Sequence, residues 1–132
     1  MSTQSNQCID VNESSSDNGA KAQQWDCNSR DAQRFRAQDA GDRTFILVNI
    51  ASGKCLDIAK VDVKQGAKLQ QWDCGSGANR KFRPMKEGDG IVLKPVPSSL
   101  CLDVEKVSDD NGAQLQQWPC NGTENQRWRP RQ

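Results

Sequence analysis

The stretch GAKLQQWDC, residues Gly66–Cys74, occurs three times in this chain with small changes. Gly19–Cys27 has the sequence GAKAQQWDC, and Gly112–Cys120 has the sequence GAQLQQWPC. The tryptophan recurs after 47 residues and then after 46. A period of this length, kept through three copies, indicates a protein built from one repeated structural unit.

The agreement between the copies extends beyond this stretch. Each copy opens with a cysteine, an aliphatic residue, an aspartate and another aliphatic residue, and a second aromatic residue follows ten positions after the tryptophan. The openings begin at Cys8, Cys55 and Cys101, and the second aromatics are Phe35, Phe82 and Trp128. We therefore expect three repeats, at about 1–40, 41–86 and 87–132, within a single domain of 132 residues.

Short β-strands explain the repeat better than helices. The period also fits helical solenoids and propeller blades, but Asn-Gly, Ser-Gly and Asp-Gly turn pairs interrupt short, alternating apolar stretches. Four strands per repeat are predicted. In the second repeat they lie near Thr44–Ile50, Cys55–Ile58, Lys68–Cys74 and Lys81–Pro84.

Six cysteines form three pairs with equal spacing, each 19 positions apart. Spacing alone does not determine the pairing, but each pair lies inside one repeat, which predicts disulfides within repeats. The pairs are Cys8–Cys27, Cys55–Cys74 and Cys101–Cys120. Free thiols in a cytosolic protein are the alternative, whereas the absence of His and of Cys-x-x-Cys pairs disfavours zinc. Disulfides predict an oxidising compartment, and therefore a secreted, extracellular protein.

Composition excludes several classes of partner. The chain has 18 basic and 17 acidic residues, which argues against nucleic acid or an anionic membrane as the main partner. No apolar run is long enough to insert into a membrane. The opening MSTQSNQCID lacks the features of a secretion signal, so we expect either a removed leader or a module cut from a longer protein.

Strand alternation gathers a characteristic set of side chains on one face. In the second repeat Cys55 and Asp57 point to the face opposite Leu56, and Gln70 and Trp72 point to the face opposite Leu69. With Cys55 bonded to Cys74 across an antiparallel hairpin, Asp57 is expected beside Trp72, with Gln70 next along. The same geometry predicts Asp10 beside Trp25 and Asp103 beside Trp118.

This combination suits a sugar. A flat indole matches the apolar C–H face of a pyranose, while a carboxylate and amides hydrogen-bond its hydroxyl groups. A lone tryptophan is more often a core residue, and a lone aspartate more often caps a turn. Here each tryptophan shares its face with polar residues, and Phe35, Phe82 and Trp128 are better candidates for the core.

With these motifs the sequence resembles the ricin B-type lectin domain and the related carbohydrate-binding modules of bacterial glycosidases. The resemblance rests on the Cys-Leu-Asp openings, the Gly-Ala-x-Leu-Gln-Gln-Trp-x-Cys strands and the closing Asn125-Gln126-Arg127-Trp128, and it covers nearly the whole chain. It implies an all-β fold, a β-trefoil of twelve strands around a pseudo-threefold axis. It also implies up to three shallow sites for galactose-type or xylan-type glycans, without a metal or other cofactor.

The resemblance also ranks the three sites. The third repeat has the family's complete set, and the second has Arg80 where the family has a second glutamine. The first repeat has Ala32 where the family has asparagine, so its site is expected to be weak or inactive. The matching residues are Asp103, Gln116, Trp118, Asn125 and Gln126 in the third repeat, Asp57, Gln70, Trp72 and Asn79 in the second, and Asp10, Gln23 and Trp25 in the first.

The first repeat departs from the others in its strands as well. Most of its first strand would precede residue 1, and Ala22 replaces the leucine found at positions 69 and 115. We therefore predict that the first repeat lacks most of its first strand. Our hypothesis is that a second copy of the chain closes this seam, and fusion to a catalytic or toxin domain is kept open.

Other functions fit the sequence less well. Without histidine, Ser-His and Cys-His nucleophilic chemistry is excluded. Asp57 and Asp73 could form a pair of carboxylates, but alternation points Asp73 away from Trp72, so we expect no enzyme activity. The run Ser108–Gly112 lacks the closing glutamate of a calcium loop. The main rival is a protein-binding β-trefoil, such as an inhibitor or a cytokine-like ligand, which would not need Asp, Gln and Trp at matching positions.

Overall fold

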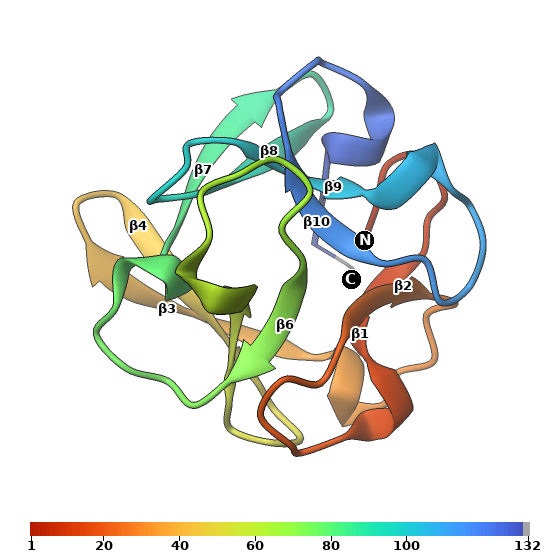
Figure 1. Ribbon diagram of the computed structural model, residues 1–132. Coiled ribbons are helices and arrows are strands. Elements are labelled where there is room, and N and C mark those ends of the chain that lie inside the picture. Colours follow the sequence, from red (N-terminus) through yellow and green to blue (C-terminus); the bar gives the residue numbers. More distant parts are fainter. Residues whose placement is uncertain (131–132) are drawn as a thin grey trace.

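The computed structural model describes residues 1–130, which form ten β-strands and six single turns of 3-10 helix (Figure 1). The strands are β1 (Cys8–Val11), β2 (Ala22–Trp25), β3 (Phe35–Gly41), β4 (Thr44–Asn49), β5 (Cys55–Ile58), β6 (Leu69–Trp72), β7 (Phe82–Glu87), β8 (Gly90–Pro95), β9 (Cys101–Val104) and β10 (Leu115–Trp118). The four strands predicted for the second repeat are present as β4 to β7, with β7 longer than expected. Among these residues, no helix has the length and apolar character needed to cross a membrane.

Three short hairpins, one from each repeat, are arranged around a pseudo-threefold axis. They are β1–β2, β5–β6 and β9–β10, and their strands are antiparallel. Figure 1 looks close to this axis, with the red–orange, yellow–green and blue repeats around the centre. Long hairpins join the repeats, β3 with β4 and β7 with β8. The predicted β-trefoil is confirmed, whereas the repeat boundaries stay a prediction.

The predicted strand register was wrong by two residues. Asp57 is paired with Gln70, and Trp72 is paired with Cys55. The predicted disulfide Cys55–Cys74 is present with a Cα–Cα distance of 5.1 Å, but it forms beyond the last residue of β6. Because the error is an even number of residues, Asp57, Gln70 and Trp72 still share one face. The other two predicted disulfides, Cys8–Cys27 and Cys101–Cys120, are also present.

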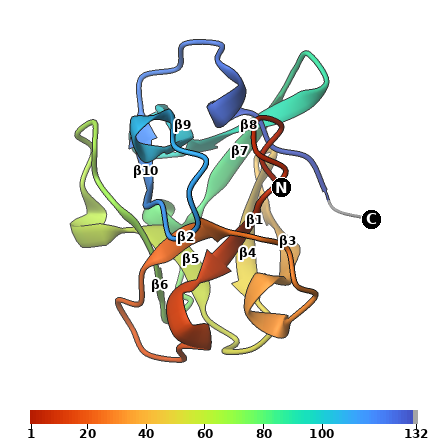
Figure 2. The ribbon, with the colours of Figure 1, turned by 90° about the vertical axis from the view of Figure 1, so that its right-hand side faces the viewer.

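The two ends of the described chain close the ring against each other. Ser2 pairs with Trp128, as Asn49 in β4 pairs with Phe35 in β3. Figure 2 shows the N-terminal segment beside the C-terminal segment. The backbone N–H of Arg129 donates to the carbonyl of Met1 at 2.9 Å. The first repeat therefore keeps only the end of its first strand, as predicted, and residues 1–130 contain ten strands where the resemblance implied twelve. Since these contacts form within one chain, the predicted homodimer stays a prediction.

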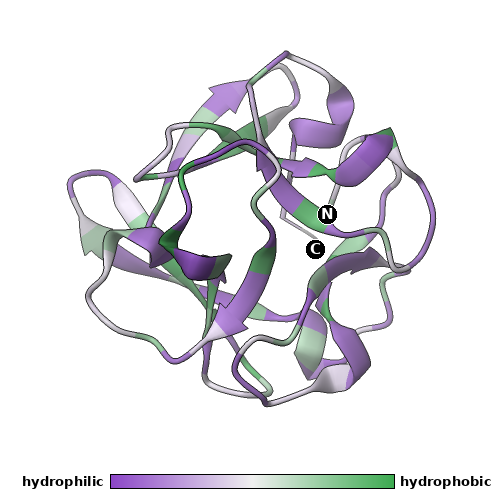
Figure 3. Ribbon diagram, viewed as in Figure 1, coloured by the Kyte–Doolittle hydropathy of each residue, from purple (hydrophilic) through white to green (hydrophobic). Residues whose placement is uncertain are grey.

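The core contains side chains from both the short hairpins and the long hairpins. Leu56, Leu69 and Leu102 are fully buried. Of the three aromatic residues predicted for the core, Phe82 and Trp128 are buried there, whereas Phe35 is only partly buried. Ala22 occupies the core position that leucine fills in the other two repeats. The hydrophobic segments in Figure 3 are short because each strand contributes one or two side chains to this core.

Candidate functional site

Each short hairpin carries an exposed tryptophan beside a buried aspartate. The exposed fractions of Trp25, Trp72 and Trp118 are 39%, 40% and 36%, so these indoles are not core residues. The aspartates lie on the neighbouring strand, where each is paired with the first glutamine of the Gln-Gln-Trp segment. The Trp, Asp and Gln of each repeat line one open hollow. The hollows have volumes of about 270, 390 and 380 Å³ for repeats 1, 2 and 3.

The third repeat has the most complete set of hydrogen bonds. Gln116 donates to Oδ1 of Asp103 at 3.2 Å. Asn125 and Gln126 donate to Oδ2 at 3.2 and 2.8 Å. Gln126 also donates to the carbonyl of Pro119, which ties the site to the residue after Trp118. All five predicted residues of this repeat are therefore brought together, with the carboxylate held in one orientation by three amides.

The second repeat keeps the same frame with one change. Gln70 donates to Oδ1 of Asp57 at 3.0 Å, and Asn79 donates to Oδ2 at 3.1 Å. Arg80 occupies the position of the second glutamine, and its Nη2 lies 3.9 Å from Oδ2 of Asp57. The predicted residues of this repeat also meet, but a guanidinium replaces an amide. In the third repeat the side-chain oxygen of Gln126 accepts a hydrogen bond from the backbone N–H of Asn121. Arginine has no acceptor atom, so Arg80 cannot make the equivalent bond in the second repeat.

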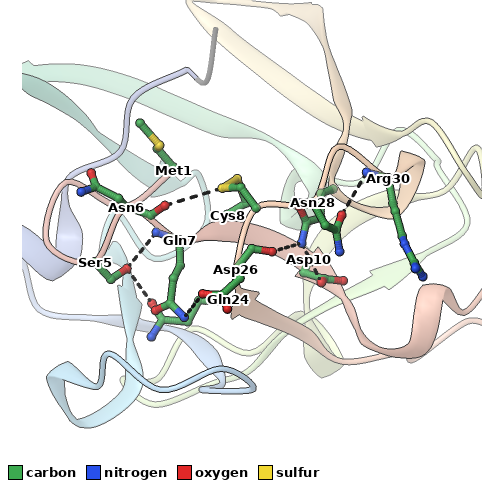
Figure 4. Close-up of a disulfide and its surroundings, with 12 residues drawn as sticks. Met1, Ser5, Asn6, Gln7, Cys8, Asp10, Gln24, Asp26, Asn28 and Arg30 are labelled. Atoms are coloured by element: carbon green, nitrogen blue, oxygen red, sulfur yellow. Dashed lines mark hydrogen bonds between the residues drawn. A yellow bond between two sulfur atoms is a disulfide. The ribbon is translucent and has the colours of Figure 1, made fainter.

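The first repeat contains a site residue that sequence analysis missed. Gln33 donates to Oδ2 of Asp10 at 3.0 Å and to the carbonyl of Asp26 at 2.9 Å, matching the contacts of Gln126. The sequence could have predicted this residue, because Gln33 follows Ala32 as Gln126 follows Asn125 in the third repeat. Asp10, Gln23 and Trp25 line the hollow as predicted. Figure 4 shows Asp10 on the same side of the Cys8 disulfide as Asn28 and Arg30.

Burial determines the protonation behaviour of the three aspartates. Desolvation raises the pKa of Asp10, Asp57 and Asp103 above the ordinary value of 3.8. Hydrogen bonds from the surrounding amides favour the ionised form and oppose this rise in pKa. Burying these carboxylates in their ionised form therefore lowers the stability of the folded protein at neutral pH. Aspartates with pKa values perturbed in this way are typical of functional sites.

A short turn after the first strand of each hairpin forms the other wall of the hollow. It contains two consecutive residues with positive φ, which are Glu13 and Ser14, Lys60 and Val61, and Lys106 and Val107. A β-branched valine is a rare occupant of this conformation, so sequence gave no signal for the turn. Val61 and Val107 project into solvent beside the tryptophans.

The three hollows share one arrangement of chemical groups, which is suited to binding. Each hollow offers one flat apolar plate, one carboxylate acceptor and neighbouring amides, which together suit a ring with an apolar face and several hydroxyls. The chain has no histidine, and its strands leave Asp73 exposed outside the hollow lined by Asp57. The family model of the ricin-type β-trefoil lectin domain matches residues 1–128.

The chain belongs to the ricin-type β-trefoil lectin family. It is therefore a carbohydrate-binding module of the lectin class, as the sequence motifs predicted. A comparison with curated proteins finds no significant match. This ricin-type lectin resembles the designed threefold symmetric protein ThreeFoil, with 34% identity over 98% of this chain and 93% of that chain, and a TM-score of 0.96.

Natural structures extend the comparison. An exo-β-1,3-galactanase from Clostridium thermocellum, 1,3Gal43A, is 30% identical over 97% of this lectin chain, with a TM-score of 0.94. The match covers only 28% of the galactanase chain. The C-half of an earthworm R-type lectin, solved in complex with GalNAc, is 14% identical over 96% of this chain and 90% of that chain, with a TM-score of 0.75, and shows the fold alone.

Proposed function

We propose that this protein is a secreted lectin module that binds galactose-type or xylan-type glycans through up to three shallow sites. The observation that carries the proposal is the site of the third repeat. There the exposed indole of Trp118 lies on the same hairpin as Asp103, whose carboxylate is oriented by three amides. Free acceptor capacity on this carboxylate would bind vicinal hydroxyls, while the indole takes the apolar face of the ring.

Comparisons favour galactose-type ligands. The similar domain of the bacterial protein belongs to a β-1,3-galactanase, and the earthworm lectin is in complex with GalNAc. We place the third repeat first in affinity because its set of residues is complete. The second repeat follows, and the first is weakest because Ala32 cannot supply the amide that Asn79 and Asn125 supply.

The three disulfides support an extracellular role, because disulfides persist in oxidising compartments. The protein would serve as a targeting or agglutinating module and would perform no chemistry of its own. The rival function, a protein-binding β-trefoil, would not need three buried aspartates whose pKa values are raised by burial beside exposed indoles.

A glycan array on the oxidised protein tests the proposal. We expect binding to galactosyl or xylosyl structures and a marked loss of signal for Trp118→Ala, whose side chain is exposed and contributes little to the core. Asp103→Ala is a second variant, checked by chemical denaturation because it leaves three amides without their acceptor. Silence across the array with intact disulfides would favour a protein-binding role, whereas unchanged binding by both Trp118→Ala and Asp103→Ala would show that the third hollow is not the sugar site.

A further inference from the structure

The three hollows differ in the sign of their charge. In repeats 1 and 3 the charged lining residues are two carboxylates and one cation. In repeat 2 they are one carboxylate and two cations. The charged residues are Asp10, Glu13 and Arg30 in repeat 1, Asp57, Lys60 and Arg80 in repeat 2, and Asp103, Glu105 and Lys106 in repeat 3. The formal charge of the lining is therefore −1, +1 and −1, and the second hollow alone is cationic.

The guanidinium of Arg80 is held firmly in this hollow. Its Nε donates to the carbonyl of Asp73 at 2.8 Å, the same type of contact that Gln126 makes with Pro119. Its Nη1 donates to Oδ1 of Asn79 at 3.3 Å. Only 17% of the side chain is exposed, so its charge is less screened than that of a surface arginine.

Arg80 also keeps donor capacity toward the hollow. A guanidinium has five N–H donors, and Nη2 lies 3.9 Å from the carboxylate of Asp57, beyond hydrogen-bonding distance. A second anionic group could therefore accept hydrogen bonds from Arg80 without displacing an existing bond. Arginine is well suited to this because its planar donors match the geometry of carboxylates and of tetrahedral oxyanions.

Lys60 adds a second positive charge on the turn that forms the opposite wall. Its side chain is exposed, and the residue before it is Ala59. The equivalent lysine of the third repeat, Lys106, follows Glu105, whose carboxylate also pairs with Lys68 at 3.1 Å. Asp62 caps the turn that carries Lys60, but its carboxylate is not among the residues that line the second hollow.

We propose that the second hollow binds an acidic sugar, a pyranose that carries a carboxylate or a sulfate ester, while the first and third bind neutral sugars. Trp72 would stack on the ring, Asp57 and Asn79 would bind hydroxyl groups, and Arg80 with Lys60 would bind the anionic group. Asp57 repels an anion, so the acidic group must face away from it. This inference rests on the proposed lectin function and names the ligand class of one of its sites.

Nuclear magnetic resonance tests the inference because each hollow has its own indole N–H as a reporter. The protein is titrated with galactose, galacturonic acid and galactose 6-sulfate at low ionic strength. We expect the Trp72 resonance to shift at about tenfold lower concentrations of an acidic sugar than of galactose, a typical gain from a charge-assisted hydrogen bond. The Trp118 resonance should favour galactose. The two acidic sugars distinguish a carboxylate site from a sulfate site.

Arg80→Gln is the matching variant, because it restores the glutamine that repeats 1 and 3 contain. The preference of the Trp72 site for acidic sugars should then disappear, while Lys86→Gln, the same charge change at an exposed position of β7, should leave it intact. Equal responses of Trp72 to acidic and neutral sugars, or an unchanged preference in Arg80→Gln, would overturn this inference alone, provided that Trp118 responds to galactose. Silence at all three indoles would overturn the lectin proposal as well.

Discussion

At the residue scale, the two glutamines of each Gln-Gln-Trp segment do different work. In the second repeat Gln70 bonds to the carboxylate of Asp57 in the hollow. Gln71 points the other way and is fully buried, where it donates to the carbonyls of Ser15 and Asp17 in the neighbouring repeat at 2.7 and 2.9 Å. One glutamine therefore contributes to the proposed sugar site, and the next joins two repeats.

This division predicts different effects for neighbouring substitutions. Gln71→Leu removes two hydrogen bonds that a fully buried side chain makes to the neighbouring repeat, so we expect the free energy of unfolding to fall by about 2 kcal/mol. Gln70→Leu should cost less stability but weaken sugar binding in the second hollow. Urea denaturation followed by tryptophan fluorescence measures the first effect, and equal losses of stability in the two variants would contradict the assignment.

The raised pKa values of the aspartates predict a pH dependence of opposite sign for binding and for stability. Sugar hydroxyls need an ionised acceptor, so affinity should fall in mild acid, at pH values above 3.8. The folded state holds these protons more tightly than the unfolded state does. Their contribution to stability is therefore full below pH 3.8 and is lost as pH rises through the raised pKa.

Calorimetric titration with a galactoside between pH 7 and pH 4 measures the binding curve. Urea denaturation at each pH confirms that the protein stays folded and allows the two trends to be compared. Affinity that stays constant down to pH 3.8 would show that Asp103 is not the acceptor of a sugar hydroxyl.

Residue-level prediction from sequence succeeded where the repeat supplied a comparison. Asp103, Trp118 and their equivalents were predicted to share one face because three copies agree in residue type and spacing, and they do share it, although the predicted register was wrong by two residues. Lys60 and Val61 were not foreseen as pocket residues, because nothing in a valine indicates positive φ. The turn adopts this conformation because the surrounding hairpin and its contacts require it, and that is tertiary information.

At the element scale, the disulfide acts on the end of the hairpin and not on its centre. Cys101 pairs with Trp118 in the strand register, and the bond to Cys120 is made two residues further on. The predicted register assumed that the cysteines were direct strand partners. Sequence cannot distinguish a register that pairs Cys101 with Cys120 from one that pairs Cys101 with Trp118, because both keep Asp103 and Trp118 on one face. The two registers differ in where β10 ends, and it ends at Trp118.

Removing this disulfide tests its contribution to the third site. The double variant Cys101→Ala and Cys120→Ala opens a loop of about 20 residues, and the free energy of unfolding should fall by about 3 kcal/mol. Because the bond holds the end of β10, where Trp118 lies, sugar affinity at that hollow should fall while the first two hollows keep theirs. An unchanged denaturation midpoint would show that the hairpin is held by its core contacts alone.

At the scale of the whole molecule, the three short hairpins share one strand register, but the pseudo-threefold symmetry is broken near the axis. The side-chain amide of Gln114 donates to three equivalent carbonyls, those of Ala22, Leu69 and Leu115, at 3.1, 3.1 and 2.7 Å. The other two repeats have lysine at this position, Lys21 and Lys68. In the sequence these three polar residues resemble ordinary surface positions. The hydrogen bonds of Gln114 depend on how the three repeats pack together, so sequence analysis could not predict them.

Assembly also decides how the sites act together. The three hollows belong to three hairpins, which Figure 1 shows arranged around the axis, so we expect a branched glycan or a polysaccharide to contact more than one of them. Each open site should be weak by itself, because it buries only one face of a ring. Simultaneous contact makes the second binding step intramolecular, which raises the apparent affinity by about 10²-fold where the geometry allows.

We therefore expect a galactan-coated surface to bind the protein far more tightly than free galactose does. On a galactan that also carries acidic sugars, the ligand class proposed for the second hollow, Trp72→Ala should lower affinity for the surface by about tenfold or more. It should leave the titration of galactose at the third site unchanged, since Trp72 and Trp118 lie on different hairpins. Surface plasmon resonance on galactan and calorimetry with free galactose supply the two measurements. Equal affinities for surface and free sugar would show that one hollow alone is active, and the threefold arrangement would then serve the fold and not the binding.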